Sequence, residues 1–274
     1  MFWLQEGRYP VDKSIQLSDL KVGYGQIVVL NNIEFTIAPG EIVCLIGANG
    51  SGKSTVLKTI TGQLKKLGGI VYLNGNDKST MSEAEVAKVV SMVMTEKIHP
   101  ELMTCFEVVA TGRYPYTNRL GFLGENDKAA ILEAIDMVGA TPIIDKDFSK
   151  ISDGQRQRIM LARAICQDAG VMILDEPTSF LDLQYKLDII SVIKKMARIK
   201  KVAVLMSIHE LEFVPAVADK VIGIAGDEVY VLGTPKEVLT GDNLEKMYNM
   251  SSGTGDELCQ GLWEYSKSIA KLLN

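Results

Sequence analysis

The chain has 274 residues, a formal net charge of −5 and an apolar fraction of 47%. A chain of this length can bury one large core or two modest ones. The acidic balance and the lack of a long basic run argue against nucleic acid as a partner. No apolar run approaches the roughly 20 residues that a membrane-spanning helix needs.

The first ten residues do not resemble a secretory signal, because their apolar stretch is short and has no basic flank. The four cysteines, Cys44, Cys105, Cys166 and Cys259, are scattered without the spacing of a metal or redox motif. Cys44 and Cys166 stand among apolar residues, which predicts buried thiols rather than disulfides. These features favour a reducing cytoplasm.

The first part of the chain predicts short strands over residues 14–20, 27–30 and 33–37, with turn signals at Gly23, Gly25 and Pro39-Gly40. An unbroken apolar run, Ile42 to Ile46, then leads into the sequence GANGSGKS and an amphipathic helix. Strand, glycine loop and helix start are the order that a phosphate-binding loop requires. The glycines let successive backbone N–H groups turn inward on phosphates without interference from Cβ atoms.

In such a loop Lys53 supplies a cation to the β- and γ-phosphates, and Ser54 supplies a hydroxyl ligand for Mg²⁺. The helix that begins near Ser51 adds its positive dipole end. The chain is therefore predicted to bind a nucleoside triphosphate. The loop residues predicted to bind it are Gly47, Ala48, Asn49, Gly50, Ser51, Gly52, Lys53, Ser54 and Thr55.

Beyond the loop, the sequence predicts strands over 69–73 and 89–94 and a mostly helical region from 96 to about 150, for example 127–138. Helical stretches then alternate with strands over 171–174 and 202–207, followed by a hairpin over 221–224 and 228–232. This order predicts an α/β nucleotide core that carries a helical subdomain.

The strand over 171–174 ends in Asp175-Glu176-Pro177. Carboxylates at the carboxyl end of a buried parallel strand lie beside the phosphate loop in such sheets. We expect Asp175 to hold Mg²⁺ and Glu176 to polarise an attacking water. The alternative is that these acids merely end a strand in solvent, which the preceding loop disfavours.

A second anion site is predicted at Ser152-Asp153-Gly154-Gln155, just before a helical stretch over 155–167. A serine and a glycine at a helix N-terminus offer a hydroxyl and free N–H groups, although such a motif is also an ordinary helix cap. Here the chain resembles the ABC-type ATPases, whose signature LSGGQ precedes the second carboxylate strand as ISDGQ does in this sequence.

Three further segments, in the same order as in those ATPases, carry the resemblance. Residues 179–182, Ser-Phe-Leu-Asp, are similar to the D-loop. His209 is similar to the switch histidine, which contacts the γ-phosphate and senses its loss. Tyr24 is similar to the aromatic residue that stacks on adenine, although a plain turn aromatic is the alternative. The resemblance thus implies Glu176 and His209 as catalytic residues.

The resemblance covers about residues 14–240 and implies a P-loop fold with a RecA-like core, an antiparallel β subdomain and a helical subdomain. It implies one ABC ATPase domain over 1–274, with the core at about 14–95 and 160–240, and the helical signature subdomain at about 96–159. The tail 241–274 has no assigned role. The resemblance further implies a homodimer that sandwiches two ATP molecules, each held in trans by Ser152, Asp153, Gly154 and Gln155.

Two positions depart from the family pattern. Asp153 stands in the signature where glycine is usual, which brings a negative charge near the phosphates. Glu96 follows the strand over 89–94 where a glutamine is expected to touch Mg²⁺. A glutamate oxygen can still ligate a hard cation, so the predicted metal ligands are Ser54, Asp175 and Glu96.

Gly112-Arg113-Tyr114-Pro115 resembles a segment in the ATPases of importers for iron chelates such as siderophores and haem, and for cobalamin. Simple helix breaking is the alternative interpretation. The resemblance implies a peripheral protein on the cytoplasmic side of the inner membrane. It would bind a polytopic permease through its helical subdomain and a substrate-binding protein indirectly. A soluble ABC ATPase of repair or translation is the main rival, and a P-loop kinase would not explain ISDGQ or His209.

Overall fold

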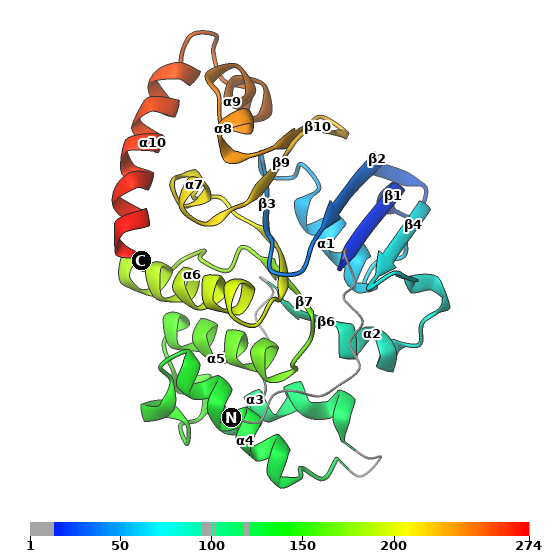
Figure 1. The fold of residues 1–274 in the computed structure, drawn as a ribbon, viewed down its shortest axis with the longest axis vertical. Coiled ribbons are helices and arrows are strands. Elements are labelled where there is room, and N and C mark those ends of the chain that lie inside the picture. The colour runs from blue at the N-terminus through cyan, green and yellow to red at the C-terminus, as the bar shows by residue number, and fades with distance from the viewer. Residues whose placement is uncertain (1–13, 95–99, 101, 118–120, 274) are drawn as a thin grey trace.

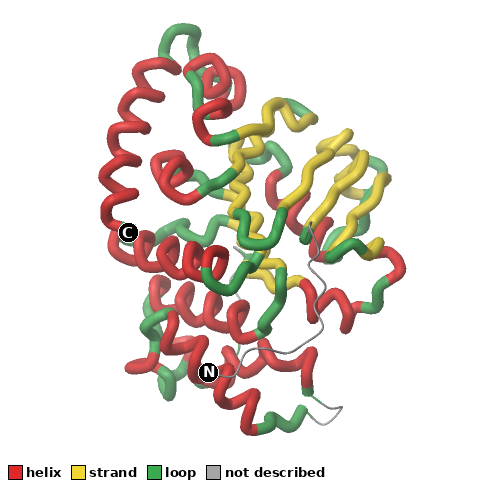
Figure 2. Tube along the Cα trace, in the orientation of Figure 1, coloured by secondary structure: helices red, strands yellow, loops and turns green. Residues whose placement is uncertain are grey.

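The computed structural model describes residues 14–94, 100, 102–117 and 121–273. The strands of this part of the chain form one sheet in the order β5-β4-β1-β2-β10-β9-β3-β8-β7-β6. An antiparallel part and a mainly parallel part meet where Glu228 of β10 pairs with Asn31 of β2. Figure 2 shows the strands gathered in one region of the molecule, with helices beside and below them.

The antiparallel part consists of β1 (Ile15–Tyr24), β2 (Ile27–Ile37), β4 (Gly68–Leu73) and β5 (Asn76–Asp77). The prediction of two strands over 27–30 and 33–37 is wrong, because β2 runs through both. The ladder with β1 shifts register between Leu20 and Val22, and Asn32 takes a left-handed φ of 52° there. A bulge thus carries the strand across Asn31 and Asn32, the two residues between the predicted strands.

The parallel part contains β3 (Ile42–Gly47), β6 (Val90–Val93), β7 (Val171–Asp175) and β8 (Ala203–Ser207). The predicted hairpin is confirmed as β9 (Lys220–Ala225) and β10 (Glu228–Gly233), and β9 lies parallel to β3. Every residue of β3, β7 and β8 is buried, which explains their unbroken apolar sequences. Their carboxyl ends therefore meet at one edge of the sheet.

Helices cover both faces of this parallel sheet. Along β3, Val43 and Leu45 face the apolar side of α1 (Lys53–Thr61), while Ile42, Cys44 and Ile46 belong to the core formed with α5 (Asp153–Cys166) and α6 (Leu183–Arg198). The alternation is the two-residue period of a strand. Cys44, Cys105 and Cys166 are buried free thiols and Cys259 is a partly buried one, as predicted for Cys44 and Cys166.

The helical region predicted after residue 96 contains α3 (Cys105–Ala110), the 3₁₀ segment η2 (Thr111–Tyr116), α4 (Glu125–Met137), η3 (Thr141–Ile143) and η4 (Phe148–Lys150). These elements lie with α5 at the lower end of Figure 1. α5 spans the predicted border near residue 160, so the two subdomains share a continuous helix.

Shorter elements complete the description. They are η1 (Lys78–Thr80), α2 (Glu83–Val89), η5 (Leu211–Phe213), α7 (Val214–Val217) and α8 (Pro235–Val238). The tail forms α9 (Gly241–Tyr248) and α10 (Gly255–Leu272). In Figure 1, α10 runs along the outer left edge of the molecule. Within the described residues, no helix has the length and apolarity needed to cross a membrane.

Candidate nucleotide-binding site

The glycine loop joins β3 to α1, and packing as well as backbone conformation requires its glycines. Gly50 and Gly52 have φ values of 78° and 97°, in the left-handed region. A Cβ on Gly52 would lie 2.8 Å from the side chains of Val29 and Leu30, and a Cβ on Gly47 would lie 2.7 Å from the carbonyl oxygen of Ile224. The loop thus packs closely against β2 and β9. The sequence interpretation had explained these glycines only by the space that phosphates need.

Lys53 closes the curve of this loop. Its Nζ donates to the carbonyl oxygens of Gly47, at 2.8 Å, and Ala48, at 3.0 Å. Burial lowers the pKa of Lys53, while the carboxylates of Glu176 and Asp175 act in the opposite direction. The ammonium group therefore lies inside the loop and close to both predicted acidic residues.

The loop fits a phosphate group. Ser51 Oγ is buried and has no hydrogen-bond partner in the part of the chain that the structure describes. The N-terminus of α1 has no side-chain cap at Gly52, so its first N–H groups point toward the same region. A phosphate oxygen would satisfy the orphaned hydroxyl and the N–H groups together, and the helix dipole favours its negative charge.

Asp175 and Ser54 form the candidate magnesium site. Ser54 Oγ donates to Asp175 Oδ1 at 3.0 Å, and Ser207 Oγ donates to the same oxygen at 2.7 Å. Oxygen ligands suit Mg²⁺, which usually completes its shell with water and substrate phosphates. The described residues contain no cluster of three or more His, Cys, Asp or Glu side chains that could hold a metal by themselves. Glu96, the third predicted ligand, lies outside the described residues.

The two predicted catalytic residues lie in direct contact. His209 Nε2 is 2.6 Å from Glu176 Oε1, and Ser179 Oγ donates to Glu176 Oε2 at 2.9 Å. Glu176 has a φ of 50°, which is uncommon for a residue other than glycine. Residues in such conformations occur most often at functional sites. Each carboxylate oxygen of Glu176 therefore has its own partner: Oε1 contacts His209, and Oε2 accepts from Ser179 in the predicted D-loop.

Sequence reasoning missed Ser207, which links the two acidic residues. Besides donating to Asp175, Ser207 Oγ accepts the backbone N–H of Glu176 at 2.8 Å. It is fully buried, and β8 pairs with β7 so that Ser207 stands opposite Asp175. A polar residue at the end of a predicted buried strand was the available signal, but the pairing of the two strands was needed to place it.

Glu210 was also missed. Its carboxylate accepts Thr178 Oγ1 at 2.9 Å and Lys186 Nζ at 2.7 Å. Burial by itself raises the pKa of Glu210, but the hydrogen bonds from Lys186 and Thr178 and the lysine charge outweigh it, so the pKa is lowered. Glu210 therefore ties the segment after His209 to the segment after Glu176, and supports the contact between those two residues.

Tyr24 lies at the end of β1, next to the loop helix. Its hydroxyl is 3.4 Å from Thr55 Oγ1, and the side chain is 51% exposed. An exposed ring beside the first turn of α1 is available to stack on a base. The structure thus brings Tyr24 together with the predicted loop, although they are separated along the chain.

The signature segment forms the start of α5. Ser152 Oγ accepts the N–H of Gln155 at 3.3 Å, and Gln155 Oε1 accepts the N–H of Ser152 at 3.2 Å, which is a capping box. Asp153 accepts Arg156 Nη1 at 3.0 Å, so a neighbouring guanidinium offsets the unexpected acid. A Cβ on Gly154 would lie 3.0 Å from the ring of Tyr185, which gives this glycine a packing role.

The segment around Arg113 has a clear structural function. Arg113 Nε donates to Asp127 at 2.8 Å, its Nη1 donates to the carbonyl oxygen of Cys166 at 2.9 Å, and its guanidinium stacks on Tyr116. A Cβ on Gly112 would lie 2.4 Å from the carbonyl oxygen of Arg163. These residues join η2 to α4 and α5, while Tyr114 is left 63% exposed on the helical subdomain.

The tail contributes a residue to the loop that sequence reasoning did not identify. Tyr248, the last residue of α9, accepts the backbone N–H of Gly47 through its hydroxyl oxygen at 3.2 Å. Burial raises the pKa of Tyr248 to about 12, so the hydroxyl is neutral at physiological pH. No local sequence signal connects two residues so far apart in the chain.

We expect Tyr248→Phe to weaken ATP binding by roughly two- to tenfold, because one neutral hydrogen bond to the loop is lost. The turnover number at saturating ATP should change little, since no acidic residue is disturbed. Equilibrium binding and steady-state hydrolysis would separate the two effects. Tyr230→Phe, on β10, is the matched control, and equal affinities in both variants would contradict a positioning role for Tyr248.

Comparison with known proteins gives a consistent result. A family model described as ABC transporter matches residues 30–179. An uncharacterised ABC transporter ATP-binding protein of Methanocaldococcus jannaschii is 41% identical, over 89% of this chain and 84% of its own length. An iron(3+)-hydroxamate import ATP-binding protein of Bacillus subtilis is 32% identical, over 87% of this chain and 89% of its own length.

Solved structures agree in fold. An inward-facing structure provisionally assigned to a metal-chelate type ABC transporter matches with a TM-score of 0.75 and 25% identity, covering 86% of this chain and 88% of the other. A dimeric ATP-binding cassette with bound ADP and Pi matches with a TM-score of 0.71 and 25% identity, covering 81% and 98%.

Proposed function

The chain belongs to the ABC transporter family, and we propose that it is the ATP-hydrolysing subunit of a membrane importer for iron chelates or related compounds such as haem or cobalamin. The site residues just described would perform the hydrolysis. The observation that carries this proposal is the Glu176 carboxylate, held by His209 and Ser179 next to the Ser54–Asp175 pair. It is the arrangement expected for activating water beside a bound terminal phosphate.

In the proposed mechanism the loop residues bind the β- and γ-phosphates, and Lys53 places its charge between them. Ser54 and Asp175 would hold Mg²⁺, which when bound offsets the negative charge of the phosphates. Glu176 orients water and accepts its proton, so that the water oxygen can attack the γ-phosphorus in line as the bond to ADP breaks. His209 contacts Glu176 and is placed to respond when the γ-phosphate leaves.

The proposal includes a homodimer that closes around two ATP molecules. Ser152, Gly154 and Gln155 at the start of α5 would complete the γ-phosphate site of the other copy, with Asp153 turned aside by Arg156. The dimeric form of the similar ADP-bound cassette supports this state. ATP would then join the copies, and hydrolysis would release them.

The helical subdomain is the proposed contact with a polytopic permease at the cytoplasmic side of the membrane. Gln157 Nε2 of α5 donates to the carbonyl oxygen of Pro177 at 3.0 Å, one residue beyond Glu176. A force on α5 would thus reach the catalytic segment directly. The substrate-binding protein would act through the permease. The names of the relatives support a chelate cargo, and the ATPase itself has no need to contact that cargo.

A pull-down of the tagged full chain from native membranes tests the transport proposal. We expect a polytopic membrane protein to copurify in stoichiometric amount. Capture of ribosomes or DNA instead would favour the soluble repair or translation class. ATP hydrolysis without any phosphate-accepting metabolite would separately exclude a kinase.

A further inference from the structure

One side of α10 exposes an apolar stripe that has no partner in the described part of the chain. Leu258, Tyr265 and Leu272 are 46%, 47% and 67% exposed. They recur every seventh residue, which places them on one side of a helix, and the exposed Gly261 and Ser268 lie between them at the intermediate turns. The buried side of α10, with Leu262, Ser266 and Ile269, faces the core instead.

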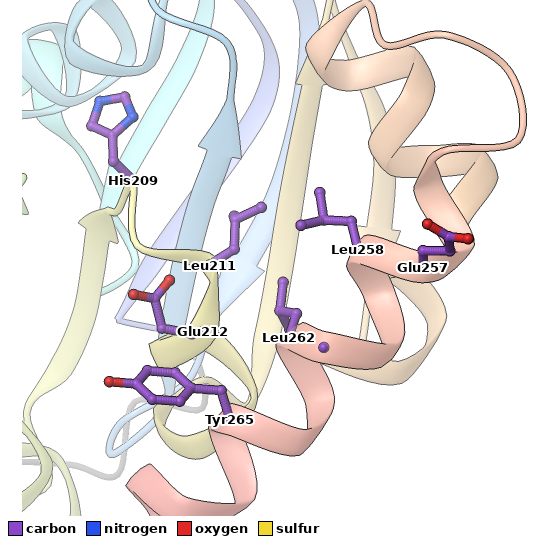
Figure 3. A pocket seen from close by; sticks show the side chains of 8 residues that line it. His209, Leu211, Glu212, Glu257, Leu258, Leu262 and Tyr265 are labelled. Carbon is purple, nitrogen blue, oxygen red and sulfur yellow. The ribbon is translucent and has the colours of Figure 1, made fainter.

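The N-terminal half of the stripe lies near His209. Leu258, Gly261 and Tyr265 line a pocket of about 490 Å³ together with Leu211 and His209. Figure 3 shows Leu258, Leu262 and Leu211 on neighbouring sides of this pocket, with the His209 side chain beyond Leu211. The apolar face of α10 thus shares a pocket with His209, on the side that the proposed function closes against a second copy.

The stripe is complementary to itself when two copies of α10 run antiparallel. In one register two of the three large side chains face small ones, with Tyr265 opposite Gly261 and Leu258 opposite Ser268 of the second copy, while Leu272 lies opposite Thr254 at the helix start. The same register brings Glu257 of one helix within about half a turn of Lys271 of the other, while the two copies of Glu264 come together near the two-fold axis. Antiparallel helices also align their dipoles favourably. A two-fold axis generates both halves of such a contact.

We propose that the α10 stripe is a dimer contact between two copies of this chain, adjacent to the nucleotide sites and independent of ATP. The proposal rests on the proposed function only in placing the second copy at the His209 side. A large residue facing a small one lets the helix backbones approach closely, and the pocket would receive Tyr265 of the second copy opposite Gly261. The two protomers would remain associated when hydrolysis opens the ATP interface.

The first test introduces charges into the stripe and uses the full chain without nucleotide. Leu258→Glu/Tyr265→Glu places like charges across the contact, so we expect dimerisation measured by sedimentation to weaken roughly 10- to 100-fold. Leu232→Glu, on β10 with a similar exposure of 44%, is the control and should leave dimerisation unchanged. A wild-type chain that stays monomeric without nucleotide at every accessible concentration would overturn the proposal.

Crosslinking tests the register. In a Cys259→Ser background, Glu264→Cys lies near the two-fold axis and should crosslink to its own copy with a short bismaleimide. Glu257→Cys should not, because its two copies would lie roughly 20 Å apart at 1.5 Å per residue. The reverse pattern, or crosslinking by neither variant, contradicts this contact.

The proposed function has a separate test. The ATP-trapped dimer of Glu176→Gln should form whether or not Leu258→Glu/Tyr265→Glu is also present. With those two substitutions it should need a higher protein concentration. If the ATP-dependent dimer forms but the nucleotide-free dimer does not, only the α10 contact is wrong. If the nucleotide-free dimer forms but ATP adds nothing, the ATP sandwich is wrong. Occupation of the stripe by a different protein in the purified complex would also count against the α10 contact.

Discussion

Glu176→Gln should lower the rate of ATP hydrolysis by roughly 10²- to 10⁴-fold, the usual loss when a general base is removed. Glutamine has nearly the same size as glutamate and can keep one oxygen for Ser179 or His209. It cannot accept the proton of water. ATP affinity should change little, because the loop and the Ser54–Asp175 pair are untouched. Phosphate release and equilibrium ATP binding, measured on the same preparation, give the two quantities.

The same variant should accumulate as an ATP-bound dimer, since closure precedes hydrolysis in the proposed cycle. Glu212→Gln is the matched control, because Glu212 lines the pocket beside His209 and is not bonded to it in the structure. It should hydrolyse ATP at the wild-type rate. If Glu176→Gln also does so, Glu176 does not position the water.

Lys53→Ala should weaken ATP binding by roughly 10- to 100-fold, the loss expected for charge-assisted hydrogen bonds to phosphate. The substitution also removes the two bonds from Nζ to the carbonyl oxygens of Gly47 and Ala48, which hold the loop curved. Asp175 and Glu176 would lose the nearest cation, and their repulsion of phosphate would increase. Equilibrium binding of a nonhydrolysable ATP analogue is the direct measurement.

Two comparisons separate a binding effect from misfolding. Lys65→Ala, at an exposed position after α1, should bind the analogue as the wild type does. Thermal unfolding of Lys53→Ala without nucleotide should show a cooperative transition, because the sheet core does not depend on the lysine. Unchanged nucleotide affinity in Lys53→Ala would rule out the phosphate role of this loop.

The sequence predicted those strands and helices whose conformation depends on the residues within the segment itself. Three strands with unbroken apolar sequences, β3, β7 and β8, are buried on both faces. A continuous apolar run of five or six residues is typical of a strand at the centre of a parallel sheet, so the sequence alone predicted them. The prediction was wrong over 27–37, where two separate strands were expected but pairing with β1 continues through a bulge. The charge of Asp153 is offset by Arg156, three residues on, a helix pairing that the sequence already contained.

The sequence by itself determined the chemistry of this protein: a glycine loop with Lys53 and Ser54, a strand ending in Asp175 and Glu176, and a capped signature helix. Each depends on residues within one turn or one strand, where spacing fixes geometry. Tertiary structure alone placed Ser207 opposite Asp175, Tyr248 against Gly47, and the exposed stripe of α10 beside His209. These contacts join segments separated by tens to hundreds of residues, and only packing around the shared core decides which of them meet.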